Sequence, residues 1–150
     1  MRCPAPVRRS DLQGRLSNDN NALWLFHSDV DMNLSGNAVA KAFRLFQQHQ
    51  PTGLLCVLHD EMEMKLGTAK LRLKGQARGH NGIRSCIQRL ATPEFARIGI
   101  GIDRPASRDS AAVTSHVLGK FTTSEMRVLK EETLPALLAA IEQLSFLQET

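Results

Sequence analysis

The sequence predicts an α/β sandwich whose sheet is mixed or mostly parallel. Segments of strand character alternate with segments of helical periodicity along most of the 150 residues, and such alternation is typical of α/β folds. The run GLLCVL, Gly53–Leu58, is continuously apolar, as in a strand buried on both faces of a parallel sheet. Two more runs, TAKLRLK at 68–74 and RIGIGI at 97–102, also have strand length and composition.

The first predicted strand lies well inside the chain. Residues 1–21 hold Pro, Arg, Ser, Asn and Asp with almost no apolar periodicity, so we expect a poorly ordered N-terminal segment and a folded domain over 22–150. ALWLF, residues 22–26, predicts a strand. The helix that follows begins behind Ser35, a favourable N-cap, and ends before Pro51. Its apolar stripe is formed by Val39, Phe43 and Phe46.

The strand predicted at 68–74 has two different faces. Its apolar residues alternate with basic ones, so they point in opposite directions from the sheet. Leu71 and Leu73 are expected to point inward, whereas Lys70, Arg72 and Lys74 form a positively charged face.

Two further helices are predicted in the second half of the chain. NGIRSCIQRL, residues 81–90, begins with Asn81 as a good N-cap. Its predicted buried stripe consists of Ile83, Ile87 and Leu90. The last helix begins at a capping box formed by Thr122 and Glu125 and continues to about residue 147, with a kink at Pro135.

Composition excludes several protein classes. The chain has the size of one soluble domain, and nineteen Lys and Arg against fifteen Asp and Glu give a net charge of +4. This excess fits either a polyanionic partner or a solvated basic face. The three cysteines, Cys3, Cys56 and Cys86, are odd in number and far apart, which predicts neither a disulfide framework nor a CxxC metal site. No apolar run is long enough to span a bilayer, so no membrane association is expected.

The segment His59-Asp60-Glu61 follows the predicted strand at 53–58. Open α/β sheets carry their active sites just beyond the C-terminal ends of such strands, which favours Asp60 as a site residue. The alternative is that Asp60 tethers the following loop. A metal site built from His59, Asp60 and His80 is disfavoured because the spacing matches no metal-binding motif.

The sequence ARGHNG lies at the start of the helix predicted at 81–90. A helix N-terminus offers unpaired backbone N–H groups, and glycines allow an anion to approach them. Arg78, His80 and Asn81 add side-chain donors, so a phosphate or an oxyanion could bind there, although an ordinary helix cap explains the pattern equally well. Asn33 in MNLSG lies at another strand-to-helix junction. Asn33, Asp60 and Asn81 could therefore converge on one rim of the sheet.

The order of five sequence blocks closely resembles the bacterial-type peptidyl-tRNA hydrolase family. The blocks are MNLSG, VLHDEMEMKLGTAKLRLK, ARGHNGIRSCIQRL, RIGIGIDRP and HVLGKF, and they extend from Ala22 to about Leu144. The form ARGHNG is more similar to eukaryotic members. The resemblance implies a three-layer sandwich with a mixed, mostly parallel sheet, and hydrolysis of the ester between a peptide and the 3′ ribose of tRNA. It implies no metal and no cofactor, and we expect a monomer.

The resemblance also implies roles for individual residues. Asp60 would orient and stabilise the basic form of the catalytic His, and Asn33 would bind the substrate near the scissile ester. Asn81 would bind the tRNA end or position the attacking water, and His80 would support that loop. The remaining expected contacts, with tRNA phosphates, are Lys70, Arg72, Lys74, Arg78 and Arg84.

The chain departs from the family pattern before Ala22. The first strand, the first helix and the catalytic His motif of the family have no counterpart there, so we expect a truncated member whose activity is doubtful. The family's aromatic residue before MNLSG is Asp31 here, and Gly99 replaces an arginine, which implies weaker tRNA binding. Alternatives are a non-catalytic tRNA- or ribosome-associated binding protein and an inactive fragment. The expected location is the cytoplasm or, because of the Arg-rich start MRCPAPVRRS, the mitochondrion.

Overall fold

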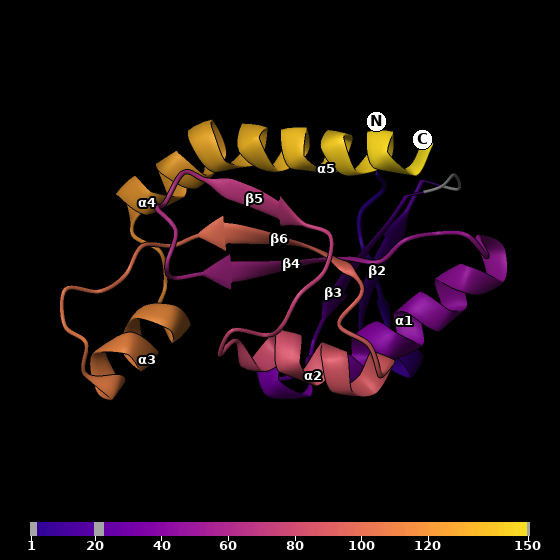
Figure 1. The fold of residues 1–150 in the computed structure, drawn as a ribbon, viewed down its shortest axis with the longest axis horizontal. Coiled ribbons are helices and arrows are strands. Elements are labelled where there is room, and N and C mark those ends of the chain that lie inside the picture. Colours follow the sequence, from indigo (N-terminus) through magenta and orange to yellow (C-terminus); the bar gives the residue numbers. More distant parts are fainter. Residues whose placement is uncertain (1–2, 20–22, 150) are drawn as a thin grey trace. The chain divides into compact units, whose positions relative to one another are not determined.

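A computed structural model of the chain describes residues 3–19 and 23–149 (Figure 1). Its contacts divide the chain into two compact units, each formed by two segments. Unit 1 comprises Met1–Leu55 and Lys74–Phe95, and unit 2 comprises Cys56–Leu73 and Ala96–Thr150. The predicted division into segments 1–21 and 22–150 has its boundary at residues 20–22, outside the described residues, and stays a prediction.

Unit 1 begins with a three-stranded antiparallel sheet. Its strands are β1 (Val7–Arg9), β2 (Gly14–Asn18) and β3 (Trp24–Ser28), and they are adjacent in the order β1-β2-β3. The tight 3-10 turn Ser10–Leu12 joins the first two, and Gln13 follows it in the left-handed conformation. Where we predicted poor order over 1–21, the described residues therefore form two strands. Propensity did not reveal them because each is only three to five residues long.

Two helices complete unit 1. Helix α1 (Ser35–His49) packs on β3 and on helix α2 (Asn81–Leu90). Leu12, Leu16 and Ala42 form a buried cluster, against which pack Trp24, Phe26 and Leu45. The predicted apolar stripe of Val39, Phe43 and Phe46 is not the buried part of α1. Its buried residues are small: Gly36, Ala38, Ala40 and Ala42. Close approach of two helices requires such small side chains at the contact.

The predicted N-caps of both helices differ from the observed ones. Leu34 occupies the N-cap position of α1, because the 3-10 turn Met32–Leu34 leads directly into Ser35. The Ser35 hydroxyl instead donates to the Met32 carbonyl at 2.7 Å. In α2 the N-cap is His80, whose Nδ1 accepts the Ile83 N–H at 3.1 Å, and Asn81 is the first helical residue.

Unit 2 contains a mixed sheet of three strands. These are β4 (Cys56–Glu61), β5 (Ala69–Arg72) and β6 (Ala96–Gly101), arranged in the order β4-β6-β5. Strand β4 runs parallel to β6, and β5 runs antiparallel to it. The predicted α/β fold with a mixed sheet is confirmed. Of the strand pairs in the described residues, only β4 and β6 are parallel, fewer than we expected.

Burial corrects two expectations about these strands. β4 is an edge strand with Leu58 47% exposed, so it is not buried on both faces, and it includes His59-Asp60-Glu61 rather than ending before them. Strand β5 ends at Arg72, which leaves Leu73 outside the strand and 52% exposed instead of inward. Ile98 on the central strand β6 is fully buried.

Three helices follow β6 along the chain. Helix α3 (Ser110–Leu118) was not predicted, whereas α4 (Thr123–Val128) begins with the predicted capping box of Thr122 and Glu125. A π-helical turn, Leu129–Thr133, separates α4 from α5 (Leu134–Glu149), which packs along β5. The predicted kink at Pro135 is thus replaced by a π-helical turn that ends two residues before the proline. This turn accommodates Pro135, which has no N–H group to donate within the helix.

Within the described ranges, no helix is long and apolar enough to cross a membrane.

Candidate functional site

The Asn33 turn and the start of helix α2 pack together in unit 1. The N–H of Gly36, at the start of α1, donates to the hydroxyl of Ser85 on α2 at 3.0 Å. Gly82 on α2 is equally close to the Asn33 turn, since a Cβ there would lie 2.8 Å from Cγ of Met32. Two of the three predicted junctions are thus brought together by the fold.

The two asparagines of these junctions are accessible. The side chains of Asn33 and Asn81 are exposed, and neither hydrogen-bonds another residue in the described part of unit 1. Their amide groups can each donate and accept a hydrogen bond. Neighbouring amides of this kind can hold an ester carbonyl, a ribose hydroxyl or a water molecule.

The loop before α2 has an unusual backbone. Arg78 and Gly79 both have positive φ, at 50° and 88°, and nothing lies within 4 Å of the position of a Gly79 Cβ. Arg78 is exposed, and His80 then returns to an extended conformation as the N-cap. Because Nδ1 of His80 accepts the Ile83 N–H, it must be unprotonated, and this nitrogen is not available as a base. His80 thus acts as a support for the loop.

The predicted phosphate contacts divide between the units. Lys74 and Arg84 are exposed in unit 1, where Lys74 Nζ lies 3.9 Å from the Glu94 carboxylate. In unit 2, Lys70 is exposed, and its register partner Gly99 pairs in turn with His59. Lys70 and Arg72 are two residues apart on β5, so they share one face of the β4-β6-β5 sheet, as predicted.

Asp60 lies on the opposite face of that sheet from Lys70. Asp60 pairs with Ile100, and Ile100 pairs with Ala69, so these residues belong to the row next to that of Lys70. Successive residues of a strand point to opposite faces, so the Lys70 side chain leaves the sheet on the face away from the Asp60 carboxylate. His59 also points away from Asp60, and its Nδ1 lies 2.7 Å from the Asp60 carbonyl oxygen.

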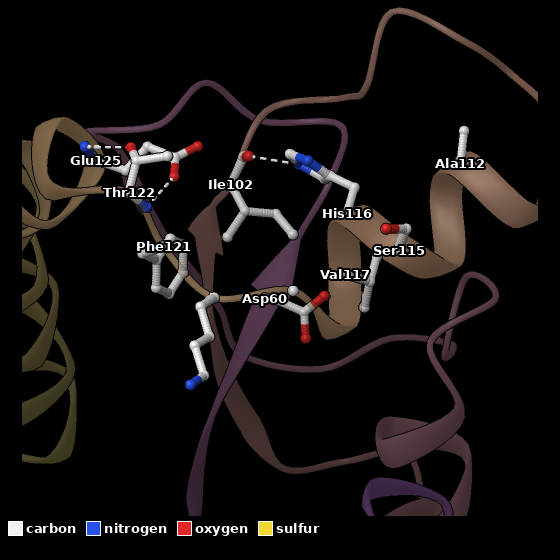
Figure 2. Close-up of a pocket in the computed structure, with 11 residues that line it drawn as sticks. Asp60, Ile102, Ala112, Ser115, His116, Val117, Phe121, Thr122 and Glu125 are labelled. Carbon is white, nitrogen blue, oxygen red and sulfur yellow. Dashed lines mark hydrogen bonds between the residues drawn. The ribbon is translucent and has the colours of Figure 1, made fainter.

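The Asp60 side chain borders an open pocket of about 620 Å³ within unit 2 (Figure 2). Helix α3 contributes one wall and the segment before α4 another. The lining residues are Asp60, Ile102, Ala112, Ser115, His116, Val117, Gly119, Lys120, Phe121, Thr122 and Glu125.

His116 is the imidazole of this pocket. Its Nε2 lies 2.9 Å from the Ile102 carbonyl oxygen and 2.8 Å from that of Asp103, and Figure 2 shows the ring directed at Ile102. Carbonyl oxygens only accept hydrogen bonds, so Nε2 is the donor in both contacts. Nothing in the sequence indicated that His116 lies in the same pocket as Asp60. Only the block HVLGKF, in which it lies, marked this segment.

Three further groups define the electrostatics of unit 2. The Thr122 backbone N–H and hydroxyl hydrogen-bond Glu125 and hold the pKa of that carboxyl below its ordinary value. The Glu63 carboxylate, which Arg104 contacts, raises the pKa of that guanidinium. Burial raises the pKa of the Cys56 thiol to about 11, so this thiol stays protonated and unreactive.

Two sequence predictions remain to be compared with the structure: the metal site was disfavoured, and Asn33, Asp60 and Asn81 were expected to converge on one rim of the sheet. Among residues 3–19 and 23–149, no group of three or more His, Cys, Asp or Glu side chains is arranged to hold a metal ion. Asn33 and Asn81 lie in unit 1 and Asp60 in unit 2. Their meeting at one rim therefore stays a prediction.

One family model matches almost the whole chain, and known proteins resemble most of it. Residues 5–149 match the family model described as peptidyl-tRNA hydrolase. A peptidyl-tRNA hydrolase of Trichodesmium erythraeum is 37% identical over 73% of this chain and 51% of its own length. That of Staphylococcus saprophyticus is 41% identical over 77% of this chain and 60% of its own length. The chain spans about half the length of the curated relatives it matches.

Solved structures agree with the sequence relatives. The crystal structure of peptidyl-tRNA hydrolase from Acinetobacter baumannii has a TM-score of 0.69 and 30% sequence identity to this chain. The match covers 84% of this chain and 63% of the other.

Proposed function

Since the chain belongs to the peptidyl-tRNA hydrolase family, we propose that it hydrolyses the ester between a peptide and the 3′ ribose of tRNA. In this reaction, the oxygen of a water molecule bonds to the ester carbonyl carbon and the bond to the ribose oxygen breaks. The ribose oxygen takes up a proton, which gives free tRNA and a peptide with a carboxyl terminus. The chain's own polar side chains supply the groups for binding and orientation, and no cofactor enters the proposal.

Asn33 and Asn81 bind the reacting end of the substrate. Asn33 holds the substrate beside the scissile ester, and Asn81 binds the tRNA end or positions the attacking water. A fixed amide donor at a carbonyl oxygen stabilises the negative charge that develops there during attack. His80 acts indirectly, because its hydrogen bond to the Ile83 N–H fixes the start of α2 and so the position of Asn81.

Asp60 would orient the catalytic His of the family, a residue for which this sequence has no matching motif before Ala22. A carboxylate beside an imidazole selects the tautomer whose other nitrogen can accept a proton, and it stabilises the imidazolium that forms. The proposal assigns this orienting role to Asp60.

Basic side chains bind the phosphates of the acceptor stem. Arg78 and Arg84 are the exposed cations nearest in sequence to the α2 start. Lys74 offers a further contact in unit 1 and Lys70 another from unit 2. These contacts are independent of nucleotide sequence and weaken with salt.

The observation that carries this proposal is the packing of the Asn33 turn on the α2 start through Gly36 and Ser85. It places two accessible amides, 48 positions apart in the sequence, in touching elements. If the two asparagines only capped helices, their amides would not need to be exposed; their exposure leaves them accessible to a substrate.

Peptide release from peptidyl-tRNA tests the proposal. We expect Asn33→Ala and Asn81→Ala each to lower kcat/KM by about 10²–10³, the usual effect of removing one such donor. Gln88→Ala is the matched control, because Gln88 is an exposed amide two turns further along α2. RNA binding by the unmodified chain without any peptide release would contradict the hydrolase proposal and favour a binding protein.

The proposal includes the chain's surroundings. We propose a monomer in the cytoplasm, with the mitochondrion as the alternative because of the Arg-rich start of the sequence. Sedimentation of the purified chain and fractionation of cells test these two statements.

A further inference from the structure

Three basic side chains form a row across the outer face of the β1-β2-β3 sheet. Arg8 on β1 pairs with Arg15 on β2, and Arg15 pairs with His27 on β3. Their side chains are 81%, 57% and 79% exposed. We call these three residues the cationic row. The adjacent residues Leu16 and Phe26 point to the other face and belong to the core of unit 1.

One carboxylate lies at the centre of the cationic row. Asp29 oxygens lie 3.8 Å from Arg8 Nε, 3.3 Å from Arg15 Nε and 3.6 Å from His27 Nδ1. Both guanidinium groups are permanently charged. A single negative charge therefore neutralises only one of them, and the row keeps a net positive charge that His27 increases when it is protonated.

Stability of the sheet does not explain this arrangement. Like charges directly opposite one another on neighbouring strands destabilise a sheet. Arg8, Arg15 and His27 nevertheless lie opposite one another in a single row across three strands, and one acid, Asp29, offsets their charge. An anion that approaches the row from outside would offset the repulsion that Asp29 leaves.

The positive charge of the whole protein is concentrated in the unit that carries the row. Unit 1 has ten Lys and Arg against five Asp and Glu, whereas unit 2 has nine against ten. The net charges are thus +5 and −1, which together give the +4 of the full chain. A polyanion will be attracted to unit 1 rather than to unit 2.

We propose that the cationic row binds the phosphodiester backbone of RNA, as a contact surface additional to Asn33, His80 and Asn81. The inference rests on the proposed function, which gives the chain an RNA substrate. Adjacent strands are about 4.8 Å apart, so the row spans about 10 Å, enough to reach neighbouring phosphates of one strand. The planar guanidinium groups of Arg8 and Arg15 match the geometry of phosphate oxygens.

The salt dependence of RNA binding tests this surface. The affinity of the full chain for an unacylated tRNA is measured over a range of KCl concentrations, where each phosphate contact adds about 1 to the slope of log Kd against log salt. We expect the double variant Arg8→Gln, Arg15→Gln to lower the slope by about 2 and to weaken binding at low salt. An unchanged slope and affinity would overturn the proposal.

Asp29→Asn gives a test of opposite sign. The amide keeps the shape of the side chain and removes the central negative charge, and the backbone N–H of Asp29 still donates to the Gln13 carbonyl. We expect tighter RNA binding than in the unmodified chain. Weaker or equal binding would show that the row does not face the phosphates.

Arg9→Gln is the matched control within β1. Arg9 is the next residue after Arg8, points to the other face of the strand, and donates to both oxygens of Asp11 at 2.9 and 2.7 Å. We expect its slope to equal that of the unmodified chain. If Arg9→Gln lowers the slope as much as the double variant does, the effect is one of net charge and the cationic row is not a contact surface.

Two additional readouts separate this inference from other outcomes. Peptide release is measured on the same proteins, so a chain that binds RNA through the row but releases no peptide refutes the proposed function alone. Binding to phosphatidylglycerol vesicles is measured in parallel. A double variant that loses vesicle binding but keeps its RNA affinity would overturn the RNA surface in favour of a membrane surface.

Discussion

The contact between Gly36 and Ser85 makes Gly36→Ala the most informative single substitution. A Cβ at Gly36 would lie 2.2 Å from the Ser85 carbonyl oxygen and 2.4 Å from its carbon. Ordinary contact begins at 3.4 Å, so α1 and α2 must separate locally by about 1.2 Å, the difference between 3.4 and 2.2 Å. These are backbone atoms, which cannot move aside as a side chain can. The hydrogen bond from Gly36 to Ser85 would also lengthen.

The cost can be estimated from two opposing effects. Overpacking of this kind typically costs 1–3 kcal/mol, about 3 where backbone must move, and the higher helix propensity of alanine returns up to about 1 kcal/mol. We therefore expect a loss of about 2 kcal/mol in the free energy of unfolding, which lowers Tm by roughly 4–8 °C for a chain of this size.

Thermal unfolding followed by circular dichroism measures this effect. Gly82→Ala is the comparison. Its Cβ would meet side-chain atoms only, Cγ of Met32 at 2.8 Å and Cε1 of His80 at 3.0 Å, which can shift more easily than backbone, so its Tm should fall less. The separation should also move Asn33 away from Asn81, so peptide release should fall more than Tm alone explains. A Gly36→Ala chain that melts at or above the Tm of the unmodified chain would refute the reasoning about this helix contact.

Three further predictions concern caps and a thiol. Thr122→Ala removes the α4 cap and should lower Tm. The pKa of the Glu125 carboxyl is lower in the folded than in the unfolded chain. The ionised carboxyl therefore stabilises the fold above its unfolded pKa, and this stability is lost as pH falls through its folded pKa. A pH titration of Tm should therefore be steeper below about pH 5 for the unmodified chain than for Glu125→Gln, and parallel curves would contradict this. Cys56, with its pKa of about 11, should react with a thiol reagent at pH 8 far more slowly than free cysteine does, and equal rates would argue against its burial. His80→Ala should destabilise α2 by about 1 kcal/mol, whereas His80→Asn should restore most of the loss, since asparagine is a strong N-cap; equal Tm values for the two would exclude the capping role.

Much of the fold could be predicted from local patterns. The helix over 81–90, the capping box at Thr122 and the strand at 97–102 follow from periodicity and from capping chemistry, which depend on neighbours in sequence. Strands β1 and β2 and helix α3 were not predicted. The short strands acquire their stability from pairing and from burial of Leu12 and Leu16, and the apolar residues of α3 are not gathered on one side, so no helical periodicity marks it.

The site shows a similar division. The residue types at Asn33, Asp60, His80 and Asn81 were apparent from the blocks that contain them. The exchange of roles between His80 and Asn81 at the helix cap was not apparent, because it depends on which side chain can reach the Ile83 N–H.

The sequence by itself determined the family, the element types and the chemical groups available for binding, because these depend on residue identity and on order along the chain. Tertiary structure alone decided which groups meet. It brought the Asn33 turn onto the start of α2, separated Lys70 from Asp60 by one register position, and aligned Arg8, Arg15 and His27 around Asp29. Strand register and helix contact are set by pairings between distant segments, and a shift of a single residue would turn each of these side chains to the opposite face.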